Sequence, residues 1–155
     1  MKFYVKQKIF SFGERFTVKD EFGNDRYFVE GEVFSIPKRF HIYDTSGKEV
    51  LLLQSRMFSF MPSYQIIRDD DVAAEIVKEF SFFHPRYRIE GSPFSVEGEV
   101  FTHDYTILRD GHPVASISKE WFTWGDSYMV NNYSGEDEQM LLAILIVIDC
   151  VLSQD

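Results

Sequence analysis

The sequence has one cysteine among its 155 residues, so no disulfide within the chain can stabilise the fold. Cys150 lies in an apolar stretch, where a cysteine more often acts as a small buried hydrophobic residue than as a nucleophile. A chain of this length is the size of one domain and buries roughly 68–70% of the surface of its unfolded form. We therefore expect a single domain over residues 1–155 that resides in the reducing cytoplasm.

Positive charge is also scarce. The chain has 16 lysine and arginine residues against 25 aspartate and glutamate residues, which gives a net charge of −9. Because nucleic-acid binding needs a basic surface to contact phosphates, the composition excludes nucleic acid as a partner. The same acidic balance weakens the case for an anionic membrane surface as partner.

Sequence motifs for catalysis, metal binding and phosphate binding are absent. The histidines lack the spacing of metal ligands, and the chain has no Gly-x-Ser-x-Gly elbow or glycine-rich strand-to-helix turn. The acidic run at residues 69–71 lacks the calcium loop of about 12 residues, so we expect a hairpin turn there. The sequence thus predicts no catalytic residue, no metal and no cofactor. The histidines are His41, His84, His103 and His112.

Only one long hydrophobic run is present, at residues 140–152. The N-terminal segment has lysines that interrupt any apolar run, so it lacks the hydrophobic region of a signal sequence. As a helix, the run at 140–152 is about 20 Å long, shorter than the roughly 30 Å hydrocarbon core of a membrane. Since it has no polar face, we expect a buried central helix over residues 135–153, with Ser134 as its N-cap, rather than a transmembrane span.

Aromatic residues make up 17% of the chain, with 16 phenylalanines, and this excess favours β-strands. The hexapeptide Val-Glu-Gly-Glu-Val-Phe occurs at residues 29–34 and again at 96–101, and a longer similarity relates residues 64–87 to 105–128. Repetition of this kind predicts a series of similar supersecondary units. Each unit opens with an aromatic residue: Phe16, Phe40, Tyr64, Tyr87, Tyr105 and Tyr128.

Each unit has the pattern of a β-hairpin. A strand with an aromatic-x-aliphatic start is followed by an Asp- or Gly-rich turn and a second strand. With an opening strand at residues 3–10, the count is about twelve strands, and sequential hairpins pair antiparallel. The sequence therefore predicts an up-and-down sheet. The clearest turns lie at residues 20–25, 44–47, 69–71 and 110–113.

The strands alternate between apolar and charged residues, as expected for a sheet with one buried face. Gly31 and Gly98 occupy equivalent inward positions of the hexapeptide, where we expect the central helix to approach closely. A barrel of about eight strands is filled by its own side chains, whereas a larger one must enclose something else. The predicted fold is mainly β: an antiparallel closed β-barrel of about twelve strands that encloses a C-terminal hydrophobic α-helix. The inward set is Phe16, Val18, Tyr27, Val29, Val33, Phe40, Ile42, Tyr87, Ile89, Phe94, Val96 and Val100.

Asp149 is the one charge inside the apolar helix, where an uncompensated carboxylate is unfavourable. In a structural hypothesis it lies at the barrel mouth or pairs with Lys78 or Lys119, which share the parity of inward residues. In a functional hypothesis it belongs to a ligand site at the helix exit.

Two loop segments, residues 56–62 and 80–85, occupy equivalent positions in the repeat and are rich in phenylalanine. Their rings either pack over the barrel mouth and cover the helix ends or insert at a membrane interface. Basic residues near these loops are the candidate ligand-binding residues, because they can bind a phosphorylated headgroup. They are Lys38, Arg39, Arg86 and Arg88.

Several of these features resemble the LURP-one-related family: the repeated hairpins, the paired Val-Glu-Gly strands, the Phe-Ser-Phe segment at residues 56–64 and the terminal apolar helix ending Ile148-Asp149. The likeness covers essentially the whole chain. The family is similar in fold to the tubby C-terminal domain and to phospholipid scramblases, which implies a twelve-stranded barrel threaded by the C-terminal helix. The tubby relationship implies binding of phosphoinositide headgroups by basic residues on the barrel.

We expect a non-enzymatic binding domain whose partner is a protein or a small ligand. One alternative is a peripheral membrane protein that binds anionic lipid or phosphoinositide headgroups. A second is an enzyme with an atypical site at the barrel mouth, which requires a concave polar pocket that holds several convergent titratable groups.

Overall fold

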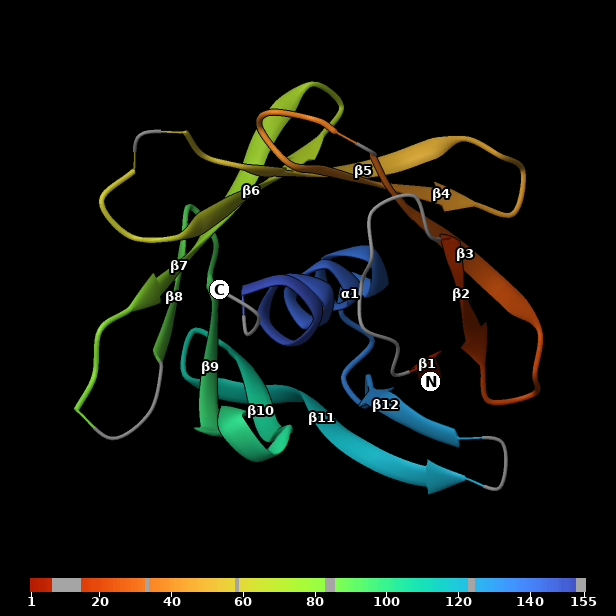
Figure 1. Cartoon of the computed structure of the whole chain (residues 1–155). Helices are drawn as coiled ribbons and strands as arrows, with labels where there is room; N and C mark the ends of the chain where they lie inside the picture. Colours follow the sequence, from red (N-terminus) through yellow and green to blue (C-terminus); the bar gives the residue numbers. More distant parts are fainter. Residues whose placement is uncertain (7–14, 33, 58, 83–85, 123–124, 153–155) are drawn as a thin grey trace.

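The computed structural model describes residues 1–6, 15–32, 34–57, 59–82, 86–122 and 125–152. Within these ranges, twelve antiparallel strands surround one helical segment (Figure 1). The expectations for residues 7–10, Val33, the Cys150 side chain and residue 153 lie outside the described set. The strands are β1 (Lys2–Lys6), β2 (Arg15–Asp20), β3 (Asp25–Gly31), β4 (Arg39–Asp44), β5 (Glu49–Ser55), β6 (Ser63–Arg68), β7 (Asp71–Glu79), β8 (Arg86–Glu90), β9 (Phe94–Glu99), β10 (Asp104–Arg109), β11 (His112–Phe122) and β12 (Gly125–Asn131).

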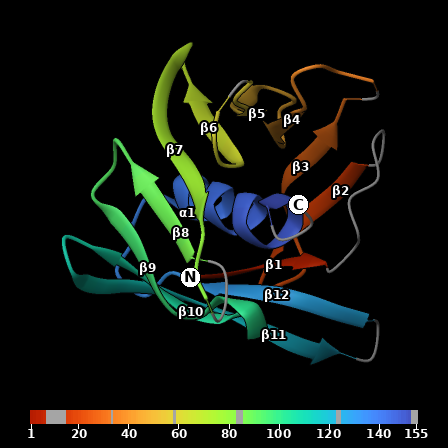
Figure 2. The same cartoon turned by 60° about the vertical axis from the view of Figure 1, so that its left-hand side comes forward.

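Each strand pairs antiparallel with its neighbour in sequence, from β1 to β8 and from β9 to β12. Strands β1 and β12 also pair, with Phe3 opposite Val130, and this pairing joins the two ends of the chain into one sheet. In the described sheet β8 and β9 are the two edge strands. They lie side by side in Figures 1 and 2, so the barrel is nearly closed. The predicted up-and-down barrel is confirmed, and the four predicted turns connect β2–β3, β4–β5, β6–β7 and β10–β11.

The hydrophobic run forms helix α1 (Glu138–Leu145), which continues as a π-helical segment (Ile146–Val151). Figure 2 shows this helix lying inside the ring of strands, with its C-terminal end toward the side to which β1 and β11 point. Every residue from Leu141 to Ile148 is fully buried. The prediction of a buried central helix is therefore confirmed, because the strands supply the apolar surroundings that an all-apolar helix requires.

The helix begins later than expected. Its N-cap is Asp137, whose carboxylate accepts a hydrogen bond from the backbone N–H of Met140 at 3.3 Å, and not Ser134. Asn132 explains the delay, since its side-chain oxygen accepts from the N–H of Glu136 and its amide donates to the Glu136 carbonyl, both at 2.9 Å. These two bonds hold residue 136 in the preceding turn and leave Asp137 as the first residue free to cap.

Acidic residues before and within the first helical turn attach the helix to the barrel wall. Three arginines from different strands bind them, and the negative charges also suit the positive end of the helix dipole. The pairs are Arg26–Glu138 at 2.6 Å, Arg68–Asp137 at 2.6 Å and Arg109–Glu136 at 3.0 Å.

Replacing Asp137 by alanine is expected to lower the free energy of unfolding by about 1–2 kcal/mol, because it removes the cap and the contact with Arg68. Asp137→Asn keeps a capping oxygen and should retain most of the stability. Urea denaturation of the two variants measures the difference. Equal losses in both would show that the charge, and not the cap, stabilises the helix end.

The aromatic residues that open the repeat units lie one on each even-numbered strand and face the barrel interior. All six belong to the hydrophobic core or pack against it, which confirms the inward parity predicted for Phe16, Phe40 and Tyr87 and shows it for the other three. Two of them, Phe40 and Tyr64, have ring centroids 6.1 Å apart. The repeat in the sequence thus corresponds to a belt of rings around the helix, made of Phe16, Phe40, Tyr64, Tyr87, Tyr105 and Tyr128.

The expectation that the helix approaches Gly31 and Gly98 is wrong. Gly31 lies opposite Phe40 on the next strand, and a Cβ at Gly31 would lie 3.0 Å from that ring. Gly98 has a φ of +118° and lies opposite Tyr105, where a Cβ would be 3.1 Å from the Tyr105 Cα. In both copies of the hexapeptide, glycine therefore makes room for the aromatic residue that opens the following unit.

Candidate functional site

The alternation of strand direction places every second connection at the same end of the barrel. Six large apolar side chains are exposed at the end where the helix terminates, in the β3–β4, β5–β6 and β7–β8 connections. We call this end the aromatic end and define it by Phe34, Ile36, Met57, Phe60, Phe80 and Phe82. Grouped exposed apolar residues commonly mark an interaction surface, whereas scattered ones do not.

The rings of Phe60, Phe80 and Phe82 are almost fully exposed. One hypothesis for the loops expected their rings to cover the helix ends. These three residues do not do so. Other rings of the predicted segments, at Phe58 and Phe83, lie outside the described residues.

Phe34 combines two unfavourable features. Its side chain is 96% exposed, and its φ of +59° lies in the left-handed region that bulky residues avoid. Neither feature helps folding, and strained residues that persist in a structure tend to occur at functional sites. The strain and exposure of Phe34 are a reason to examine the aromatic end as the candidate site.

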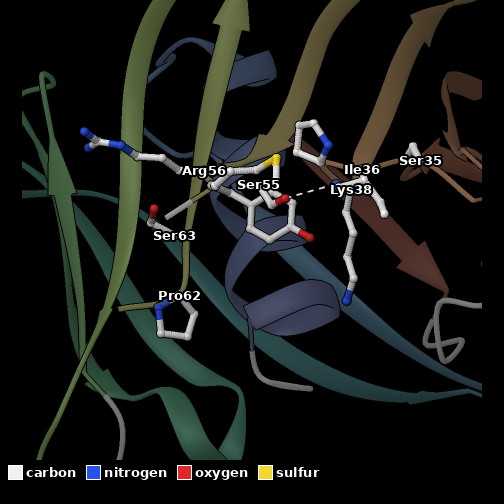
Figure 3. Close-up of a pocket in the computed structure, with 10 residues that line it drawn as sticks. Ser35, Ile36, Lys38, Ser55, Arg56, Pro62 and Ser63 are labelled. Atoms are coloured by element: carbon white, nitrogen blue, oxygen red, sulfur yellow. Dashed lines mark hydrogen bonds between the residues drawn. The ribbon is translucent and has the colours of Figure 1, made fainter. Parts of the chain in front are cut away.

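A pocket of about 300 Å³ lies at the aromatic end, between the β3–β4 and β5–β6 connections (Figure 3). The backbone N–H of Lys38 donates to Ser55 Oγ at 3.0 Å, which ties the two connections together beside the pocket. Ile36 and Met57 form exposed apolar parts of its wall. The full lining is Ser35, Ile36, Pro37, Lys38, Ser55, Arg56, Met57, Pro62, Ser63 and Tyr64.

The polar side chains of the pocket wall are hydroxyl and cationic groups, and no carboxylate is among them. Ser63 is only 4% exposed, and its hydroxyl makes no hydrogen bond with any described residue. The Ser35 hydroxyl is likewise buried and unbonded within the described chain. Buried hydroxyls are normally hydrogen-bonded, so these two are exceptions, as is the buried Ser127 hydroxyl outside the pocket.

The four predicted basic residues do not converge. Lys38 lines the pocket, and Arg56, which the prediction did not single out, lines it as well. Arg86 is exposed on β8 beside Arg88, but three strands separate β4 from β8 in the sheet. The structure thus places Lys38 in the wall of this pocket and Arg86 and Arg88 elsewhere on the same end.

Acidic neighbours engage two of these arginines. Arg39 donates from Nε to Gln54 Oε1 at 2.9 Å and lies 3.5 Å from Glu32. Arg88 contacts Glu90 at 2.7 Å, and this hydrogen bond raises the pKa of the Arg88 guanidinium above its ordinary value. Both side chains are therefore partly neutralised before any ligand arrives.

His41 lies next to Arg39 on the outer wall and shares Glu32 with it. Burial alone would lower the pKa of His41, but hydrogen bonds to Glu49 and Glu32 outweigh it and raise the pKa above the ordinary value. The outer face of β4 is thus a network of paired charges.

The acidic turns lie at the opposite end of the barrel, which we call the acidic end. Hydrogen bonds from the backbone N–H groups of Asn24 and Phe22 lower the pKa of Asp20, and bonds from Ser46 and Lys48 lower the pKa of Asp44. These carboxylates therefore stay ionised well below neutral pH. The acidic end comprises Asp20, Glu21, Asp44, Asp69, Asp70, Asp71 and Asp110.

Asp149 forms a buried polar cluster near the end of the helix. It is 3% exposed, accepts from the Tyr105 hydroxyl at 2.7 Å and lies 2.7 Å from His103 Nδ1. The His103 ring in turn meets Tyr128 edge-on, with centroids 5.1 Å apart. Lys78, one of the two expected partners, donates to the carbonyl of Leu152 at 3.0 Å.

The prediction named neither His103 nor Tyr105 as a partner of Asp149. Tyr105 is the aromatic residue that opens its unit, and Phe16, Phe40 and Tyr87, which open other units, were predicted to face inward. His103 precedes β10 and has a φ of +60°. Strand parity was therefore the signal that could have identified Tyr105, whereas it carries no information on His103, which lies outside the strand. The pocket hydroxyls of Ser35 and Ser63 carry no comparable signal, because their burial depends on how two connections fold over each other.

No helix in the described ranges is long and apolar enough to cross a membrane. Among the described side chains, no group of three or more His, Cys, Asp or Glu residues is arranged to hold a metal ion.

Comparison with known proteins agrees with this architecture. Residues 1–149 match the family model described as LURP-one-related. The chain is 33% identical over 156 aligned positions to the uncharacterised protein YxjI of Bacillus subtilis strain 168, with 100% of this chain and 96% of YxjI covered. An X-ray structure of an Arabidopsis thaliana protein superposes with a TM-score of 0.65 at 16% identity, covering 96% of this chain and 88% of that one, which shows a shared fold. The chain belongs to the LURP-one-related family.

Proposed function

We propose that the chain is a non-enzymatic binding domain that docks its aromatic end on an anionic membrane surface. One observation carries the proposal: the exposed apolar side chains that define the aromatic end lie beside basic residues of the same connections and adjoining strands. Phenylalanine rings of this kind bury themselves at the boundary between headgroups and acyl chains, while lysine and arginine contact the anionic headgroups. The basic residues are Lys38, Arg39, Arg56, Arg86 and Arg88, of which Arg39, Arg56 and Arg88 also contact acidic neighbours.

The carboxylates of the acidic end lie away from this surface. Strands of about six residues separate the two ends by roughly 20 Å, at about 3.3 Å per residue. The Debye length at physiological salt is about 8 Å, so charges on the acidic end are largely screened from a surface that touches the aromatic end. The acidic end would face away from the membrane and favour a single orientation of the bound protein.

The filled interior of the barrel favours a binding function on an outer surface over catalysis inside the barrel. The helix occupies the space enclosed by the strands, and its residues pack against those of the wall in one hydrophobic core. At the helix end, Asp149 bonds to both His103 and Tyr105. These features support outer surfaces and loops as the place where a partner binds.

Combined replacement of Phe34 and Phe60 by alanine is expected to weaken binding to anionic vesicles about tenfold or more, because each exposed ring contributes apolar area at the interface. Co-sedimentation with phosphatidylcholine vesicles that contain or lack phosphatidylserine, at low salt, measures this binding. Phe22→Ala is the matched control, since Phe22 is also exposed but lies in the β2–β3 turn at the acidic end.

We expect the Phe22→Ala variant to bind as the original chain does. If the original chain does not sediment with anionic vesicles at low salt, where electrostatic attraction is strongest, membrane docking is wrong. The proposal also fails if Phe22→Ala reduces binding as much as the pair at the aromatic end.

A further inference from the structure

His41 lies between two carboxylates on the outer face of β4. Its Nδ1 contacts Glu49, the first residue of β5, and its Nε2 lies 3.3 Å from Glu32, which follows β3. Both ring nitrogens donate only when the ring is protonated, because a neutral ring has one donor and one acceptor. The arrangement therefore fits the protonated ring, and loss of the proton leaves one of the two contacts without a donor.

Acidic side chains surround this ring. Among the described residues, β3 places Glu30 opposite His41 in the sheet, and the Glu32 and Glu49 carboxylates lie against the ring nitrogens. The cation of the same strand is Arg39, which shares Glu32 with the histidine. Burial lowers the pKa of His41, but the hydrogen bonds and charges of Glu49 and Glu32 outweigh it and raise the pKa above its ordinary value.

The other neighbours of the ring do not change charge with it. Tyr43 stacks on His41 with centroids 6.1 Å apart, and burial raises the pKa of its hydroxyl above the ordinary value, so it stays neutral where histidine titrates. On β5, the residue opposite His41 is apolar Leu52. On β2, Arg15 lies opposite Glu30, with its guanidinium 4.5 Å from the centre of an aromatic ring of β3. Histidine is thus the residue type of this face whose charge changes near neutral pH.

Glu32 connects this cluster with the aromatic end. Its backbone N–H donates to the carbonyl of Arg39 at 3.0 Å, which closes the base of the β3–β4 connection that carries Phe34 and Ile36. Its carboxylate lies 3.5 Å from Arg39 and 3.3 Å from His41. Glu32 is therefore shared between a guanidinium whose charge is constant and a histidine whose charge depends on pH.

Loss of the His41 proton changes how Glu32 is shared. The remaining ring proton stays on Nδ1, because the contact with Glu49 is the shorter of the two. Nε2 then presents a lone pair to the Glu32 carboxylate, and two acceptors repel each other. The Glu32 carboxylate consequently pairs with Arg39 alone, which leaves Arg39 with less positive charge to offer to a headgroup.

We propose that protonation of His41 controls membrane docking of the aromatic end, by deciding whether Glu32 is held by the histidine or neutralises Arg39. The protonated ring holds Glu32 and leaves Arg39 available to an anionic headgroup. The neutral ring releases Glu32 to Arg39, so binding weakens as the pH rises and the histidine loses its proton. This regulation rests on the proposed membrane function.

Vesicle binding at two pH values measures the effect. Phosphatidylcholine vesicles that contain phosphatidylglycerol are suitable, because the phosphodiester keeps its charge across the range. Co-sedimentation at about pH 6 and about pH 9 brackets the titration of histidine. We expect the original chain to bind about fivefold more weakly at the higher pH, as for the loss of about one positive charge at the surface.

Three variants fix the switch in one state. His41→Gln cannot hold Glu32 by charge and should bind weakly at both pH values, as the original chain does at the higher one. His41→Lys keeps a positive charge throughout and should bind tightly at both. Glu32→Gln removes the carboxylate that neutralises Arg39 and should also bind tightly at both.

Two matched controls come from the same chain. His112→Gln removes an exposed histidine at the start of β11, at the acidic end. Glu30→Gln removes a carboxylate from the same face of β3, two residues before Glu32. Both variants should keep the change of binding with pH. If His41→Gln keeps it as well, or if His112→Gln abolishes it, the proposal is overturned, because another group then governs the pH dependence.

A second measurement needs no membrane. An NMR titration follows the ring of His41 and the side-chain carboxyl carbon of Glu32 in the original chain. The two signals should move with a single midpoint, because the histidine proton determines the surroundings of the carboxylate. A Glu32 signal that does not follow His41 would overturn the switch, whether or not vesicles bind.

The switch and the membrane proposal fail in different ways. If Glu32 follows His41 but vesicle binding does not change with pH, the regulation is overturned and membrane docking stands. If no vesicle binds at either pH, membrane docking is wrong, and its regulation by His41 is overturned with it.

Discussion

Replacing Ile144 by aspartate is expected to unfold the protein. Ile144 is fully buried at the middle of the central helix, within the single core that the strands and the helix share. An unpaired carboxylate at such a position costs several kcal/mol, which is comparable with the roughly 5–15 kcal/mol that stabilises a typical domain. Loss of near-ultraviolet circular dichroism and of the cooperative thermal transition would reveal the unfolding.

Ile36→Asp is the matched control, because the same substitution occurs at a residue that is 81% exposed. This variant should keep the fold, with a free energy of unfolding within about 0.5 kcal/mol of the original chain. It should bind anionic vesicles less well, since Ile36 lies at the aromatic end. An Ile144→Asp variant that remains folded would mean that the strands form a stable core without the helix, contrary to the structure.

The architecture was predictable because its signals are periodic. The opening aromatic residues recur along the chain, and each proved to lie on an even-numbered strand with its ring toward the helix. The start of the helix was not predictable in this way. Ser134 and Asp137 are both good capping residues, and the choice between them depends on Asn132, whose side chain bonds twice to Glu136.

The candidate site was predictable in part. The topology alone places alternate connections at opposite ends of the barrel, so the separation of aromatic loops from acidic turns follows from the strand order. The summed charge of −9 conceals this separation, because it averages two ends of different composition. The pocket was not predictable, since its wall comes from two connections that are distant in sequence and lie beside each other only in the fold.

Asp149 provides the second large effect, because it is the charged member of a buried cluster. Asp149→Leu is expected to lower the free energy of unfolding by about 3 kcal/mol. The leucine removes the acceptor of the Tyr105 hydroxyl and the partner of His103, and it leaves both polar groups at least partly buried. Urea denaturation measures this as a lower midpoint at an unchanged m-value. Asp104→Leu, on the exposed start of β10, should change stability by no more than about 0.5 kcal/mol.

A double-mutant cycle with Tyr105→Phe tests whether the loss arises from this hydrogen bond. Removing only one partner leaves a buried polar group unpaired, whereas removing both leaves apolar groups in contact. Asp149→Leu should therefore cost about 1–2 kcal/mol less when Tyr105 is already phenylalanine, a coupling typical of residues in direct contact. Strictly additive losses would show that Asp149 does not act through Tyr105. In that case the stability of the helix end would depend on the contact of Asp149 with His103, which a His103→Gln variant in the same cycle would measure.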